Sequence, residues 1–176
     1  GLGVWYRTCG THSHKEVEAI AKEIRASKMP CDVLGLEPGW HSRAYSCSYS
    51  WSKERFPKPE ELLKKLRASG YHVNLWEHCF VHPESPIRKA LEPVSGDFSV
   101  WQGLVPDFSI KKAADIFANY HRDNLVKKGV SSFKLDECDN SDFIVSPWSF
   151  PECSKFPSGL DGEQMHSMLG LLYQAV

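Results

Sequence analysis

The feature that most constrains the fold is a unit of strand, loop and helix that recurs along the chain. A β-prone run at 4–9 precedes a helical pattern at 13–27, in which apolar residues recur every three or four positions. Similar pairs of strand and helix patterns occur at 33–36 and 59–69, 71–76 and 109–126, and 130–135 and 161–172. The chain therefore predicts four strand–loop–helix units.

Helix boundary signals support these units. Ser13 and Glu16 form a capping box, and Asp161 with Gln164 forms another capping pair. Pro59 suits a first helical turn, and Gly70 and Gly129 suit the positions just beyond helix ends. We expect the segments 38–56 and 77–107 to be long loops that follow strands.

Long loops on the carboxyl side of the strands favour a parallel sheet with right-handed crossovers. A doubly wound sheet would carry a glycine-rich phosphate turn after its first strand, and the segment 7–12 has none. A barrel places polar groups at the ends of several strands, as Glu37, Glu77 and Asp136 are placed here. We therefore predict an α/β fold of the TIM-type (β/α)8 barrel.

The length of the chain limits how much of that barrel it contains. Eight βα units need about 250 residues, whereas this chain has 176 residues and supplies about the first four units. We expect residues 1–176 to be one partial catalytic barrel domain, a fragment of a longer enzyme. Its outer strands would need cover from self-association or from the remaining half of the barrel.

Composition and charge limit the classes of binding partner that the chain predicts. The formal net charge is -1, so no basic field predicts nucleic-acid binding. No apolar run reaches the roughly 18 residues of a membrane span, and we expect no membrane partner. The six cysteines lack zinc or redox spacing, which favours reduced thiols. Six tryptophans exceed the needs of a core and indicate a sugar or ligand site.

The segment 131–140 is typical of a buried strand that ends in a site. Apolar Val130, Phe133 and Leu135 precede several acidic residues. We interpret Asp136 as a catalytic carboxylate; the alternative is that 136–142 is a solvated acidic turn.

Five segments, taken in order, resemble the catalytic barrel of glycoside hydrolase family 31. Phe133-Lys134-Leu135-Asp136 resembles the family's F-K-x-D nucleophile segment, and 51–59 (WSKERFPKP) is similar to its W-[DS]-x-x-x-F-P-[DK]-P motif. The others are Gly3-Val4-Trp5, the segment 33–40 (VLGLEPGW) and Gln164-Met165-His166. The resemblance covers nearly the whole chain and implies a retaining, exo-acting α-glycosidase.

The resemblance also implies roles for single residues. Asp136 would be the nucleophile, Lys134 would keep it ionised, and Glu37 would bind sugar hydroxyls in the deepest subsite. The other implied substrate-binding residues are Trp40, Trp76, His166 and Asp107. The resemblance implies a carbohydrate substrate, with no cofactor and no metal.

Five of these residues also have a purely structural interpretation. Trp40 and Trp76 would be plain core, and Lys134 a solvated or paired lysine. His166 would cap its helix, and Asp107 would be a helix N-terminal charge.

Two departures from the family pattern leave the identity of the substrate sugar open. Glu37 replaces an Asp, and Trp76-Glu77-His78-Cys79 replaces a Trp-Ile-Asn-Pro-like segment. An α-galactoside or α-N-acetylgalactosaminide is therefore an alternative to an α-glucoside or α-xyloside.

The family's general acid follows a later strand, so we expect none in this segment; Glu77 and Asp139 are surrogate candidates. Two other functions stay open. One is a non-catalytic carbohydrate-binding half-barrel. The other is a metal-dependent hydrolase with Asp136, Glu137, Asp139 and His78 as ligands.

Overall fold

The computed structural model describes residues 3–138 and 149–176, and these residues form two compact units. Unit 1 comprises Gly1–Ser42, Ser50–Trp76 and Arg122–Lys134. Unit 2 comprises Arg43–Tyr49, Glu77–His121 and Leu135–Val176.

The main sheet has four strands in the order β1-β2-β3-β6. Its strands are β1 (Trp5–Arg7), β2 (Val33–Leu36), β3 (His72–Glu77) and β6 (Ser132–Leu135). β1 pairs with β2, and β2 with β3, in parallel. Within the main sheet, the strands therefore lie side by side in the order in which they occur in the sequence, which is the strand order predicted for a barrel.

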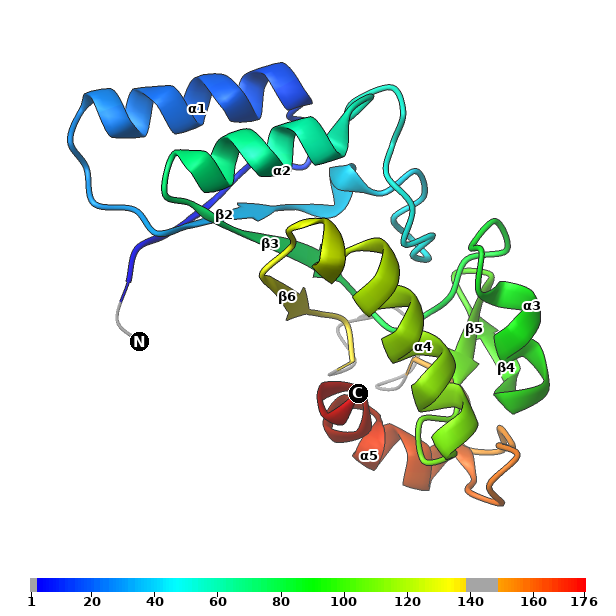
Figure 1. Cartoon of the computed structure of the whole chain (residues 1–176). Coiled ribbons are helices and arrows are strands. Elements are labelled where there is room, and N and C mark those ends of the chain that lie inside the picture. Colours follow the sequence, from blue (N-terminus) through cyan, green and yellow to red (C-terminus); the bar gives the residue numbers. More distant parts are fainter. Residues whose placement is uncertain (1–2, 139–148) are drawn as a thin grey trace. The chain divides into compact units, whose positions relative to one another are not determined.

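Two helices of unit 1, α1 (His14–Ala26) and α2 (Pro59–Ala68), lie side by side along one face of the sheet (Figure 1). The predicted capping box of Ser13 and Glu16 starts α1, and Pro59 occupies the first turn of α2. Their apolar faces pack against the strands in one buried cluster, which includes Val17, Leu62 and Leu75. Burial of each such side chain contributes about 1.5–3 kcal/mol.

Both predicted loops contain secondary structure. The first contains the short helix η1 (Pro38–Trp40). In the second, α3 (Arg88–Leu91) and η2 (Glu92–Val94) lead into an antiparallel hairpin of β4 (Ser95–Val100) and β5 (Gly103–Pro106). The two segments predicted as long loops thus also contain short helices and a hairpin.

The hairpin was missed because its turn lacks the usual residues. Trp101 and Gln102 connect the two strands with φ values of 48° and 65°. Two-residue hairpin turns with positive φ at both positions favour Asn-Gly or Asp-Gly. Trp-Gln carries no such signal, so only the folded chain shows the turn.

The remaining helices are α4 (Lys111–Asn124), η3 (Val126–Lys128) and α5 (Gly162–Ala175). Gly129 ends η3 in the left-handed conformation, and Asp161 caps α5 as predicted. On α5, Met168 is exposed while Tyr173 is buried. The buried stripe runs through Met165, Leu169 and Tyr173 at four-residue spacing. Among the described residues, no helix has the length and apolar character needed to cross a bilayer.

We expect Gly39→Ala to destabilise unit 1 by about 1–3 kcal/mol, the usual cost of overpacking. A Cβ at Gly39 would overlap the Gly10 carbonyl oxygen, which is backbone and cannot rotate away. Urea unfolding measures the change in the free energy of unfolding.

The matched control is Gly10→Ala. A Cβ at Gly10 would lie 4.0 Å from the Gly39 nitrogen, an ordinary contact. Equal midpoints for the two variants would contradict a close approach of 10 and 39.

Candidate active site

The backbone turns sharply at Asp136, directly after β6. The Asp136 N–H donates to the Glu77 carbonyl at 2.9 Å, which continues the strand pairing by one residue. Glu137 then adopts the left-handed conformation with φ 61°, and its N–H donates to Asp136 Oδ1 at 3.1 Å. Non-glycine residues rarely adopt this conformation, and such strain is concentrated at functional sites. The half-buried carboxylate of Asp136 is thus oriented by the residue that follows it.

An exposed tyrosine lies next to this turn. The Tyr45 hydroxyl donates to Glu137 Oε1 at 3.1 Å, and its ring lies edge-on to Trp101 at 5.1 Å between centroids. Partial burial of the phenol, together with the charges of Glu137 and Asp136, raises the pKa of Tyr45. Tyr45 therefore keeps its proton at neutral pH and acts as a donor.

The His78 ring contacts the rings of both Tyr45 and Trp101. Its ring centroid is 5.6 Å from that of Tyr45 and 5.3 Å from that of Trp101, and the side chain is fully buried. Burial lowers the pKa of His78 to about 3. The Phe80 N–H donates to His78 Nδ1 at 3.2 Å, so the neutral ring carries its hydrogen on Nε2.

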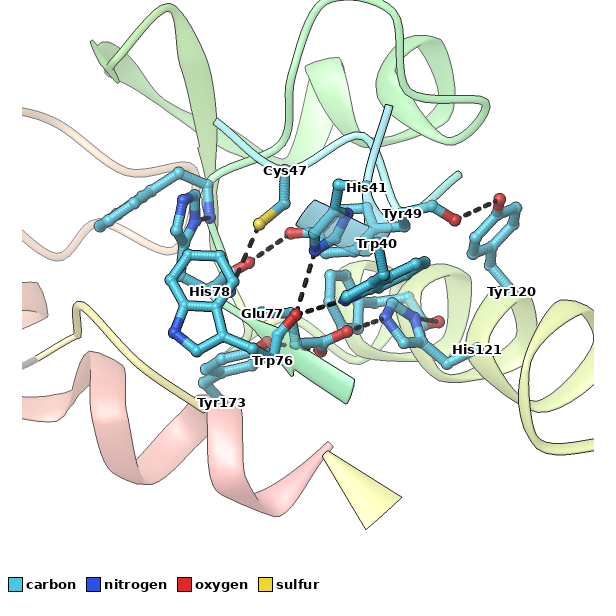
Figure 2. A network of polar contacts seen from close by, with 12 residues as sticks. Trp40, His41, Cys47, Tyr49, Trp76, Glu77, His78, Tyr120, His121 and Tyr173 are labelled. Carbon is cyan, nitrogen blue, oxygen red and sulfur yellow. Dashed lines mark hydrogen bonds and ion pairs between the residues drawn. The ribbon is translucent and has the colours of Figure 1, made fainter. Parts of the chain in front are cut away.

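The Glu77 carboxylate is buried in unit 2, with a side-chain exposure of 1%. Tyr173 donates its hydroxyl to Oε1 at 2.6 Å, and His121 Nε2 lies 3.0 Å from Oε2 (Figure 2). His121 Nδ1 donates to the Phe117 carbonyl at 2.9 Å. Because both Glu77 oxygens have protein partners and little exposure, the geometry does not favour Glu77 as a surrogate acid. Asp139, the other surrogate, lies outside the described residues.

Two sugar-wall candidates in unit 1 are buried. Trp40 has an exposure of 0% and belongs to the core cluster, and Trp76 has an exposure of 2%. The Trp40 Nε1–H donates to the Trp76 carbonyl at 2.7 Å (Figure 2). In the described structure, both indoles fit the core interpretation better than that of an open pocket wall.

The polar candidates of unit 1 are more accessible. Glu37 precedes η1, has a side-chain exposure of 12% and lies 3.7 Å from the Arg7 guanidinium. Arg55 supports this segment, since its Nε–H donates to the Gly39 carbonyl at 2.7 Å. Lys134 is half-buried on β6.

The last two candidates belong to unit 2. Asp107 is fully buried and accepts hydrogen bonds from the Ser109 hydroxyl and from the Ser158 N–H, the latter at 3.0 Å. These contacts fit a structural carboxylate better than a sugar ligand. His166 does not cap α5, because Asp161 does so. Partial burial lowers the pKa of His166.

No three His, Cys, Asp or Glu side chains among residues 3–138 and 149–176 gather closely enough to hold a metal ion. The described part of the proposed metal set, Asp136, Glu137 and His78, thus offers no cluster. All six cysteines are free thiols.

Sequence reasoning missed several residues of this site. Tyr45 contacts a carboxylate 92 residues away, and the partners of the Glu77 carboxylate are 44 and 96 residues away. A histidine or tyrosine on an amphipathic helix carries no local signal for such contacts. The cluster of aromatic residues at 40–51 was the one available hint for Tyr45.

Comparison with known proteins gives a consistent result. A family model described as "Glycosyl hydrolases family 31 TIM-barrel domain" matches residues 1–176. An α-xylosidase, XylQ, from Lactiplantibacillus pentosus is 30% identical over 98% of this chain. An α-xylosidase from Emericella nidulans is 24% identical over 99% of it. The chain spans 23% of the length of each of these two relatives.

Solved structures show the same fold. A family 31 dextranase from Flavobacterium johnsoniae, complexed with glucose, aligns over 99% of this chain and 23% of its own, with a TM-score of 0.79 and 19% identity. A cycloalternan-forming enzyme from Listeria monocytogenes aligns over 98% of this chain and 19% of its own, with a TM-score of 0.75 and 15% identity. The prediction of a partial TIM barrel is confirmed.

We expect His78 to make folding stability depend on pH. Its folded pKa of about 3 lies below the ordinary value of 6.5, so between these pH values the unfolded chain binds a proton that the folded chain does not. Stability therefore falls as pH falls through this window, by up to about 1.4 kcal/mol per pH unit from this group. Unfolding by urea between pH 7 and pH 4 tests this.

His78→Asn should flatten the pH dependence, because the Asn Oδ1 can still accept a hydrogen bond without titrating in this window. His72→Asn, at an exposed histidine, is the control and should leave the slope unchanged. Equal slopes for all three proteins would contradict the assignment to His78.

Proposed function

The chain belongs to family 31 of the glycosyl hydrolases, and we propose that the complete protein is a retaining α-glycosidase with Asp136 as its nucleophile. The main support is the Asp136 turn. The carboxylate directly follows a strand of the barrel sheet, is half-buried, and is oriented by the N–H of a left-handed residue. The F-K-x-D segment that carries it lies within the matched residues.

In the proposed reaction, a carboxylate oxygen of Asp136 attacks the anomeric carbon of the sugar. A carboxylic acid protonates the departing glycosidic oxygen, and water later hydrolyses the glycosyl ester. The hydrogen bond from Glu137 N–H orients one carboxylate oxygen of Asp136. Lys134, two residues earlier on the strand, is proposed to add a positive charge on the same strand face.

The general acid is assigned to a carboxyl group outside residues 1–176. In the retaining geometry it lies about 5–5.5 Å from the nucleophile. Glu77 is buried and bonded to two side chains, which does not suit a group that must reach a glycosidic oxygen.

For the substrate we place α-xylosides and α-glucosides first. Two relatives are named α-xylosidases, and one similar structure holds glucose. Glu37, with its partly accessible carboxylate beside Arg7, is the proposed ligand of sugar hydroxyls. An α-galactoside or α-N-acetylgalactosaminide is the alternative, because Glu37 and the segment 76–79 depart from the family pattern.

We expect covalent labelling of Asp136 by an activated α-glycosyl fluoride with a second fluorine on the ring. Fluoride leaves with little acid assistance, while the ring fluorine slows hydrolysis of the ester, so the intermediate accumulates. Intact-mass spectrometry of the complete protein, followed by peptide mapping, locates the label. The sugar that labels fastest among xylosyl, glucosyl and galactosyl fluorides identifies the substrate class.

Asp136→Asn should take up no label, whereas Asp97→Asn, at another carboxylate of unit 2, should be labelled like the unmodified protein. Sugar-dependent quenching of tryptophan fluorescence without label or turnover would instead indicate a carbohydrate-binding protein. A label on another carboxylate would contradict the role of Asp136.

Glu37→Ala should lower kcat/KM by about 10- to 100-fold, because a charged hydrogen bond contributes about 1.5–3 kcal/mol. Steady-state hydrolysis of aryl α-glycosides by the complete protein measures the change. Glu23→Ala, at an exposed position of α1, is the control. An unchanged kcat/KM for Glu37→Ala would exclude Glu37 from the sugar site.

A further inference from the structure

We propose that Glu77, His121 and Tyr173, here called the Glu77 network, are positioning residues for the nucleophile. The inference rests on the proposed role of Asp136. It concerns residues that do not touch the sugar and act through the backbone of the residue that does.

The backbone of Glu77 is bonded to the backbone of Asp136. Its carbonyl accepts the Asp136 N–H at 2.9 Å, the last described backbone hydrogen bond before the left-handed turn at Glu137. The place of the Glu77 carbonyl therefore decides where the Asp136 backbone begins its turn.

The Glu77 side chain is held by residues of two helices. Tyr173 on α5 and His121 on α4 bind separate oxygens of its carboxylate, at 2.6 Å and 3.0 Å (Figure 2). Two helices thus fix the position of Glu77, whose carbonyl binds the backbone of Asp136. The carboxylate cannot shift without breaking a buried hydrogen bond.

The rings of Tyr173 and His121 are themselves held by packing. The Tyr173 ring is stacked on Phe108 at an angle of 11°, and the His121 ring is stacked on Phe117 at 19°. His121 Nδ1 also bonds the Phe117 carbonyl. Both rings are therefore held in fixed orientations toward Glu77.

Each side-chain polar atom of the Glu77 network has a hydrogen-bond partner. The Phe117 carbonyl only accepts, so His121 Nδ1 carries a hydrogen. The other ring nitrogen, Nε2, lies 3.0 Å from Glu77 Oε2, and Glu77 Oε1 accepts from Tyr173. A buried polar group with its partners in place avoids the cost of an unsatisfied one.

A polar network at a core position also calls for an explanation. Replacing such a group by well-packed apolar residues is often neutral or stabilising, so stability alone does not account for it. Hydrogen bonds are directional, whereas apolar packing is not. We therefore infer that the network fixes the end of β3 in one position. Displacement of a reacting group by about 1 Å can cost about 100-fold in rate.

The test is the rate of labelling of Asp136 in the complete protein by the activated fluoride of the sugar that labels it fastest. Tyr173→Phe removes one hydroxyl and keeps the ring. Glu77→Gln keeps an acceptor for Tyr173 and an amide for His121, whereas Glu77→Leu keeps only apolar volume. The first-order inactivation constant, the half-saturating concentration and the labelled fraction are recorded for each variant.

We expect Tyr173→Phe and Glu77→Leu to lower the inactivation constant by about 10- to 100-fold, with the half-saturating concentration unchanged. Glu77→Gln should restore most of the rate. The matched control is Tyr71→Phe, which loses a buried hydroxyl that donates to the Ala21 carbonyl in unit 1. It should label at the unmodified rate, even if its melting temperature falls by as much as that of Tyr173→Phe.

A network that serves stability alone would lower the labelled fraction and the melting temperature but leave the inactivation constant unchanged. That result, or equal rates for Glu77→Leu and Glu77→Gln, overturns this inference and leaves the proposed function standing. Absence of label on Asp136 in the unmodified protein overturns the proposed function and this inference with it.

Discussion

The burial of a carboxylate at the end of β3 is the constraint on which the organisation of unit 2 depends. A carboxyl group removed from water costs free energy unless its oxygens have hydrogen-bond partners. Glu77 obtains its partners from α4 and α5, so both helices must present a polar side chain at the same place. Phe108 and Phe117 stack on the rings of Tyr173 and His121.

Apart from the buried Glu77 carboxylate, unit 2 contains backbone conformations that few residue types favour. Glu137 in the turn and Trp101 and Gln102 in the hairpin all have positive φ. Around the turn, Tyr45 and Glu137 bond one another, and the rings of Tyr45, Trp101 and His78 contact each other. The strained residues thus lie among mutual contacts, which is how a protein maintains conformations that cost about 1–3 kcal/mol each.

Unit 1 was predictable because its signals are local. The capping box of Ser13 and Glu16, Pro59 in a first turn and apolar residues at helical spacing each act within a few residues, and the structure has them as expected. Unit 2 was predictable only in part. Trp101-Gln102 gave no turn signal, and Tyr173 was overlooked on α5 because its contact with Glu77 crosses 96 residues. Trp40 and Asp107, which the sequence predicts at the sugar, are buried and have protein partners.

The sequence by itself determined the alternation of strands and helices, the parallel barrel order and the place of Asp136 at a strand end. These follow from periodicity, capping and strand polarity, which act between near neighbours in the chain. Only the tertiary structure decided which polar groups are enclosed, which donors meet the Glu77 carboxylate and how the backbone turns after Asp136. Those outcomes depend on burial and on hydrogen bonds between distant segments, and neither exists until the chain has folded.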